Sequence, residues 1–114
     1  MLPGTPPLKK AGFKEMLLWA LGQRRRFRVE GDSMLPLLKS GDEVLINPSG
    51  ALSVGDIVVC RHPIQSDITI IKQIEAIEGD RIVLTGLNEN SSSDSYIFGF
   101  VDQKLIIGLV TSKF

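Results

Sequence analysis

The sequence predicts a mainly β fold with one short helix near the N-terminus, and two patterns lead to this prediction. From residue 27 onward, short runs rich in valine, isoleucine and leucine alternate with turn signals about every eight to twelve residues, which is typical of small all-β domains. Before that point, apolar residues recur at helical spacing in one short segment. A length of 114 residues is enough for one domain and too short for two.

The predicted helix covers residues 11–22 and follows a proline-rich lead. Residues 1–8 hold three of the six prolines, so we expect this lead to be flexible. One face of the helix carries five apolar residues, which are Phe13, Met16, Leu17, Ala20 and Leu21. Gly22 ends the pattern. Because the apolar run is much shorter than the roughly 20 residues that span a bilayer, we expect no transmembrane anchor.

The charges are unevenly distributed along the chain. Residues 1–30 carry seven basic and two acidic side chains, a net charge of +5, whereas residues 31–114 carry six and eleven, a net charge of −5. The whole chain is neutral and residues 1–26 are too short for a helix-turn-helix, so we expect no nucleic-acid partner. The basic residues on both sides of the helix leave weak contact with an anionic membrane surface open. We expect instead that the helix packs on the domain or carries an ordinary solvated charge run.

Six strands are predicted after the helix, over residues 27–30, 43–47, 57–61, 68–78, 81–85 and 104–110. Four Gly-Asp pairs, which begin at residues 31, 41, 55 and 79, are predicted turns. The polar segment 88–95 has the composition of a linker, with a functional loop as the alternative because it lies inside a compact domain. We therefore divide the chain into a flexible lead with a short basic amphipathic helix, residues 1–26, and a main domain, residues 27–114.

Cysteine and histidine each occur once, as Cys60 and His62. One cysteine excludes a disulfide within the chain, and the pair cannot supply the usual four ligands of a zinc site. We therefore expect no metal and no other cofactor. A single thiol suits a reducing compartment, so we expect a cytoplasmic protein.

Ser33 is a candidate nucleophile because it follows a predicted turn in the run Gly31-Asp32-Ser33-Met34-Leu35-Pro36. A serine hydroxyl is a poor nucleophile until a base takes its proton. His62 is one candidate base, although it lies in a polar segment that is typical of a loop. Lys72 is the better candidate because it interrupts an apolar strand, where alternation places it on one face with Ile70 and Ile74.

For Lys72 to act as a base, burial must keep its amine uncharged. The pKa of a free lysine is about 10.4, and desolvation in a low-dielectric groove lowers the pKa of such a group. A neutral amine accepts the Ser33 proton and passes it to the leaving amine. The alternative is a lysine at the edge of a strand, whose charged end reaches water.

Three ordered blocks of the chain resemble the signal-peptidase-like Ser/Lys peptidases, a family that includes the self-cleaving domains of SOS repressors. The blocks are residues 31–38 with the Gly41-Asp42 turn, Lys72 followed by Gly79-Asp80, and residues 86–95 leading into 98–101 and 107–108. Together they cover about residues 27–110. The resemblance implies a compact β fold of short twisted strands of the signal-peptidase and SOS-repressor type, and a Ser/Lys peptidase domain over residues 27–114.

The resemblance also implies roles for individual residues. Ser33 would attack the scissile carbonyl, Lys72 would be its base, and Ser92 would hydrogen-bond the lysine amine. Asp94 matches a structural carboxylate of the last block. The backbone N–H of Ser33 would stabilise the oxyanion, and four neighbouring residues would shape the oxyanion hole and the groove, namely Gly31, Asp32, Met34 and Pro36.

The chain departs from the family pattern at several positions. Gly31 stands where some members have an oxyanion serine, so that side-chain donor is missing. Leu87 and Tyr96 replace an acid and an arginine of the last block, and Gln73 replaces an arginine after the lysine. These changes affect the expected surroundings of Asp94 more than those of Ser33 and Lys72.

The arginine-rich lead into residues 27–34 and the missing anchor are similar to the nickel-type superoxide dismutase maturation proteases within this family. That resemblance implies a substrate, a nickel superoxide dismutase precursor whose N-terminal propeptide is removed. A nickel site that uses a free α-amine cannot form until that bond is cut. The alternatives are a general signal peptidase at a membrane surface, a self-cleaving regulatory domain, and an inactive module that binds extended peptides.

Overall fold

The computed structural model describes residues 8–31, 34–65, 67–87 and 100–114. One α-helix, seven strands and one 3-10 helix follow one another along these ranges. In chain order they are α1 (Phe13–Ala20), β1 (Arg25–Arg28), β2 (Glu43–Asn47), β3 (Ile57–Arg61), β4 (Thr69–Glu78), β5 (Arg81–Thr85), β6 (Phe100–Asp102), η1 (Gln103–Leu105) and β7 (Ile106–Lys113). The fold is mainly β, as predicted.

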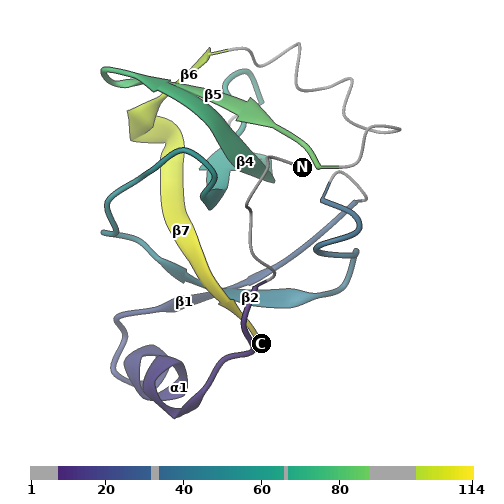
Figure 1. The fold of residues 1–114 in the computed structure, drawn as a ribbon, viewed down its shortest axis with the longest axis vertical. Coiled ribbons are helices and arrows are strands. Elements are labelled where there is room, and N and C mark those ends of the chain that lie inside the picture. Colours follow the sequence, from purple (N-terminus) through teal and green to yellow (C-terminus); the bar gives the residue numbers. More distant parts are fainter. Residues whose placement is uncertain (1–7, 32–33, 66, 88–99) are drawn as a thin grey trace.

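The described strands form one antiparallel sheet in the order β1-β2-β7-β3-β4-β5-β6 (Figure 1). The C-terminal strand β7 lies between β2 and β3 and so joins the early strands to the rest of the sheet. Register shifts interrupt the pairing of β7 with both neighbours, and another interrupts the pairing of β4 with β5. Bulges of this kind bend strands and increase their twist, which accounts for the curled sheet in Figure 1.

The curled sheet encloses two clusters of buried apolar side chains. The first cluster comprises Val29, Met34, Leu38, Val44, Ile46, Ile57, Val59, Ile71, Leu87 and Val110. The second cluster comprises Val58, Cys60, Ile74, Ile82, Leu84 and Val101. Successive residues of β3 alternate between the two clusters, because side chains along a strand point to opposite faces. A strand that is buried on both faces explains why residues 57–60 are continuously apolar.

Most strand bounds agree with the sequence prediction. β2, β3 and β5 have the predicted bounds, and β4 begins one residue later than predicted. β1 begins at Arg25, two residues before its predicted start, and therefore crosses the predicted domain boundary at residue 26. The predicted strand 104–110 is divided between η1 and β7, and β6 was not predicted.

The Gly79-Asp80 turn shows why the glycine of a Gly-Asp pair is needed. Glu78 at the end of β4 pairs with Arg81 at the start of β5, so Gly79 and Asp80 alone connect the two strands. Gly79 has a φ of 63°. A glycine with positive φ at the first position of a two-residue connection is typical of type II′ hairpin turns.

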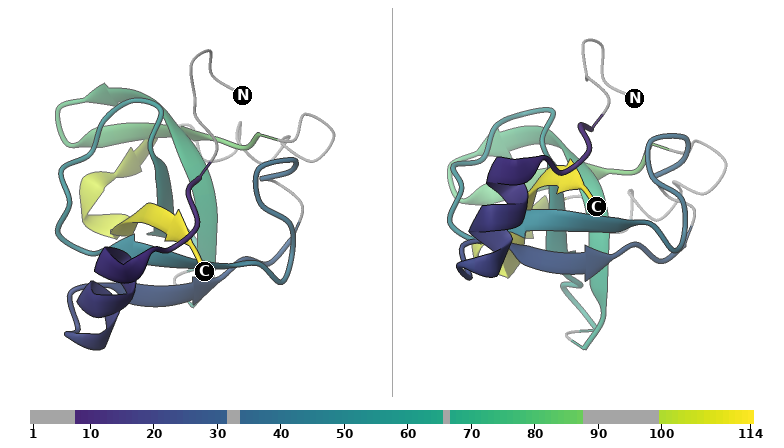
Figure 2. Two further views of the ribbon diagram at one scale, coloured as in Figure 1. Left: turned by 60° about the horizontal axis from the view of Figure 1, so that its bottom comes forward. Right: turned by 90° about the horizontal axis from the view of Figure 1, so that it is seen from below.

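Helix α1 differs from the prediction in the face that it presents to the domain. We expected that the helix packs on the domain or carries an ordinary solvated charge run. It does contact the domain, but not through its apolar side, because no residue of α1 is buried and Phe13 and Leu17 are 85% and 47% exposed. The contact is made instead by Glu15, whose Oε1 accepts hydrogen bonds from the hydroxyls of Thr111 and Ser112 in β7. Figures 1 and 2 show α1 at one end of the molecule, beside β1 and the C-terminus. In the described ranges, no helix has the length and apolar character needed to cross a membrane.

Candidate active site

Lys72 lies near the middle of β4 and is 3% exposed, although lysine is among the residues least often buried. It pairs with Val58 of β3, a member of the second cluster. Alternation along β4 places Lys72 on the sheet face that also carries Ile70 and Ile74, which pack in the same cluster. A low-dielectric setting of this kind disfavours the charged form of an amine.

The residue after Lys72 is also buried and polar. Gln73 is 0% exposed, and its Nε2 donates a hydrogen bond to the carbonyl oxygen of Gly55 at 3.0 Å. Gly55 has a φ of 96° and lies in the turn before β3. Gln73 therefore ties β4 to the turn that precedes its neighbouring strand, which fixes the position of the strand that carries Lys72. Sequence analysis identified Gln73 only as a departure from a family pattern.

The segment around the predicted nucleophile is held at both ends. Gly31 has a φ of 85°, and its N–H donates to the hydroxyl of Ser40 at 3.3 Å. On the other side, Met34 is fully buried in the first cluster, and its carbonyl accepts a hydrogen bond from the N–H of Leu38 at 2.9 Å. Pro36 is exposed and follows a cis peptide bond. Met34 therefore anchors the described residues after Ser33 to the core, while Pro36 lies at the surface.

Ser33, Asp32, Ser92 and Asp94 lie outside the described residues. The roles that the sequence assigns to them stay predictions. The polar segment 88–95 also lies outside the described residues.

His62 has a structural environment that disfavours a role as general base. Its Nδ1 accepts hydrogen bonds from the backbone N–H groups of Ile64 and Gln65, at 3.0 and 2.9 Å. A neutral imidazole that accepts at Nδ1 carries its proton on Nε2, so neither nitrogen is available to take the proton of a serine. His62 instead organises the connection between β3 and β4.

Cys60 is a buried residue of the second cluster. Its thiol is 0% exposed and donates to the carbonyl oxygen of Arg61 at 3.1 Å. Burial raises the pKa of Cys60 to about 12. Because the thiolate is the reactive form, this residue is not a nucleophile at neutral pH. Within the described residues, no three His, Cys, Asp or Glu side chains gather as a metal site.

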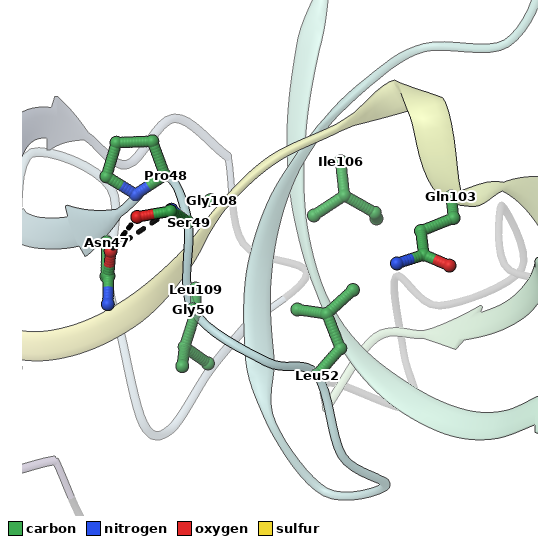
Figure 3. A pocket seen from close by; sticks show the side chains of 9 residues that line it. All are labelled: Asn47, Pro48, Ser49, Gly50, Leu52, Gln103, Ile106, Gly108 and Leu109. Carbon is green, nitrogen blue, oxygen red and sulfur yellow. Dashed lines mark hydrogen bonds between the residues drawn. The ribbon is translucent and has the colours of Figure 1, made fainter.

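A cavity of about 280 Å³ opens on the part of the molecule where β2 and β7 meet (Figure 3). Its lining residues are Asn47, Pro48, Ser49, Gly50, Leu52, Gln103, Ile106, Gly108 and Leu109. A Cβ at Gly108 would lie 3.1 Å from the carbonyl oxygen of Asn47, which is a tight contact, so glycine suits this close approach of the strands. Lys72, the described residue of the predicted dyad, does not line this cavity.

Comparison with known proteins identifies a family match for most of the chain. Residues 15–111 match the family described as Peptidase S24-like. The match includes the segment that contains Ser33, the buried Lys72 and most of β7. No curated protein matches the chain at a significant level.

Proposed function

Because the chain belongs to the Peptidase S24-like family, and is therefore a serine peptidase or a self-cleaving peptidase domain, we propose that it is a Ser/Lys endopeptidase. Its substrate class is a protein. In this proposal Ser33 is the nucleophile and Lys72 is the general base. Residues 27–114 form the catalytic domain, and the lone buried cysteine is in keeping with a cytoplasmic location.

The observation that carries the proposal is the burial of Lys72. An exposed lysine is protonated near neutral pH and cannot accept a proton. At 3% exposure, and on a sheet face with Ile70 and Ile74, Lys72 has lost most of the water that stabilises its charge. No other described residue supplies a comparable base on that face. The Cys60 thiol keeps its proton at neutral pH because burial raises its pKa to about 12, and His62 Nδ1 already accepts two backbone hydrogen bonds.

The reaction follows from these two groups. The Ser33 oxygen attacks the carbonyl carbon of the scissile bond while Lys72 Nζ takes the hydroxyl proton. The tetrahedral intermediate collapses, the C–N bond breaks, and Lys72 gives the proton to the leaving amine. Water then repeats the sequence on the acyl-enzyme, with Lys72 again as the base. The lysine therefore cycles between its neutral and charged forms once in each half of the reaction.

The remaining predicted site residues have supporting roles in this proposal. The backbone N–H of Ser33 stabilises the oxyanion. Gly31 and Asp32 belong to the oxyanion hole and groove before Ser33, and Pro36 shapes the groove after it. Met34 is fully buried and supports the groove from the core without lining it. Separately, Ser92 hydrogen-bonds the lysine amine, and Asp94 supports the segment that carries Ser92.

For the substrate, we propose the N-terminal propeptide of a nickel superoxide dismutase precursor. The support is the sequence resemblance of the lead and the Ser33 segment to the maturation proteases of that enzyme. The chemistry agrees, since a metal site that uses a new α-amine requires the peptide bond before it to be cut first.

The direct test is incubation of the purified chain with such a precursor, followed by measurement of intact mass. We expect release of one N-terminal fragment, with the chain itself unchanged in mass. Ser33→Ala and Lys72→Ala should each abolish release, and the double variant should lose little more, because the two groups act as one unit. Lys72→Arg should also fail, since a guanidinium stays protonated.

Two controls give this test its meaning. Ser53→Ala and Lys104→Ala remove the same chemical groups at exposed positions and should retain full activity. Activity retained by Lys72→Ala would contradict the dyad. A precursor that stays intact while the chain loses a fragment of its own would show a self-cleaving domain instead.

A further inference from the structure

Helix α1 presents its apolar side to solvent. Exposed fractions are 85% for Phe13, 37% for Met16, 47% for Leu17 and 64% for Leu21. These residues, with Ala20, occupy positions i, i+3, i+4, i+7 and i+8, which lie on one face of a helix. A continuous exposed apolar face is unusual on a folded domain and marks an interaction surface.

The orientation of α1 is fixed by polar contacts on its other side. Glu15 accepts from Thr111 and Ser112 of β7, and its Oε2 accepts from Arg24 Nε at 3.1 Å. Trp19 packs edge-on against Phe114, with ring centroids 5.2 Å apart. The helix is therefore attached to the sheet through a carboxylate and an aromatic pair, and its apolar side chains stay exposed. Figure 2 shows α1 at one edge of the molecule.

Basic side chains surround this apolar face along the chain. Lys9 and Lys10 precede the helix, Lys14 lies within it, and Arg25 follows it in β1; all four are exposed. The acidic residue of the helix, Glu15, is turned inward and paired with Arg24. The outer surface of this region therefore combines apolar area with positive charge, the composition of helices that lie in the interface of an anionic membrane.

We propose that α1, with the basic residues 9, 10, 14 and 25, is a docking surface for anionic lipid bilayers. A two-fold contact between copies of α1 would bring the basic residues of both copies together, so charge opposes that alternative. A protein partner would need a groove shaped to a helix that projects from one end of the molecule (Figure 1), whereas a fluid lipid surface needs no matching shape. This proposal goes beyond the peptidase function and does not depend on it.

The experiment is co-sedimentation of the full chain with vesicles of phosphatidylcholine alone and of phosphatidylcholine with phosphatidylglycerol. We expect binding to the anionic vesicles only, and a loss of binding in high salt.

Two variants separate the apolar and the charged parts of the surface. Phe13→Ser with Leu17→Ser removes exposed apolar area and should weaken binding by at least roughly tenfold. Lys14→Gln with Arg25→Gln should weaken it by roughly 25-fold, about fivefold for each charge. Ile64→Ser, at a position 76% exposed in the β3–β4 connection, and Lys104→Gln are the matched controls and should bind like the wild type.

The four positions substituted in the two α1 variants are exposed. The thermal unfolding of these variants should therefore be nearly unchanged, and their cleavage of a substrate in solution should be unaffected. The proposal is overturned if the wild type ignores anionic vesicles, or if the control variants lose binding as much as the α1 variants. It is equally overturned if sedimentation velocity without lipid shows a wild-type dimer that Phe13→Ser with Leu17→Ser dissociates, because the face would then be a contact between copies.

Discussion

Replacement of Glu15 by alanine tests how α1 is attached to the sheet. The carboxylate is 18% exposed and accepts hydrogen bonds from Thr111, Ser112 and Arg24. A hydrogen bond to a charged group contributes roughly 1.5–3 kcal/mol, but partial exposure screens the pair with Arg24, so we expect the free energy of unfolding to fall by about 2–4 kcal/mol. Part of this loss arises because Ser112, at 2% exposure, would be left without its acceptor.

The same substitution should also unfold the helix itself. An isolated helix of eight residues is not stable in water, and α1 has no buried residue to hold it in place. We therefore expect urea denaturation to give a lower midpoint and hydrogen exchange to show lost protection over residues 16–23. Glu75→Ala, at an exposed position of β4, is the control and should change neither. Unchanged protection of α1 in Glu15→Ala would refute the attachment described here.

The pH dependence of stability gives a second measurement of the same contact. Burial of Glu15 works to raise its pKa, but the hydrogen bonds from Thr111 and Ser112 and the charge of Arg24 outweigh it, so the pKa is lowered from the ordinary value of 4.5. Because the folded chain has the lower pKa, this contribution is fully present above 4.5 and disappears as pH falls through the folded value. The difference in the free energy of unfolding between the wild type and Glu15→Gln should therefore shrink on acidification. A difference that grows on acidification would contradict a lowered pKa of Glu15.

Three further predictions concern single residues. Because burial raises the pKa of Cys60 to about 12, iodoacetamide at neutral pH should modify it only after unfolding, and intact mass will reveal any early labelling. Gly79→Ala should lower the free energy of unfolding by about 1 kcal/mol, because alanine is strained at a φ of 63°; an unchanged urea midpoint would contradict this strain. Lys72→Met should abolish cleavage while the chain stays folded, because a side chain of similar length still fills the buried position but carries no amine; cleavage by this variant would contradict the role of the amine.

The strands with strong local signals were predicted closely, and the others were not. Residues 43–47, 57–61 and 81–85 are short apolar runs bounded by turn residues, and their bounds match β2, β3 and β5. β6 has only three residues and exists because Val101 pairs with Ile82 of β5, a contact distant in sequence. β1 was displaced because Arg25 and Arg26 carry no strand signal, although pairing with β2 and the ion pair from Arg26 to Glu43 place them in the sheet.

For the helix and for the site, the sequence predicts what depends on local patterns and not what depends on contacts distant in sequence. An apolar stripe normally indicates the buried face of a helix, but the attachment of α1 depends on Glu15 and two hydroxyls almost 100 residues away, which no local pattern reveals. The burial of Lys72 was predicted, because alternation in an apolar strand is a local signal. The environment of His62 required the structure, since it depends on backbone N–H groups rather than on residue types.

The central claim is that the amine of Lys72 is uncharged when it meets the Ser33 hydroxyl. The most direct measurement is an NMR titration of a chain labelled at its lysine side chains, with the Lys72 signal assigned by its loss in Lys72→Met. We expect this signal to titrate at lower pH than the signals of the exposed lysines, and cleavage activity to rise with pH over the same range. A Lys72 signal that titrates together with the exposed lysines would show that the amine is charged at neutral pH and is not the base.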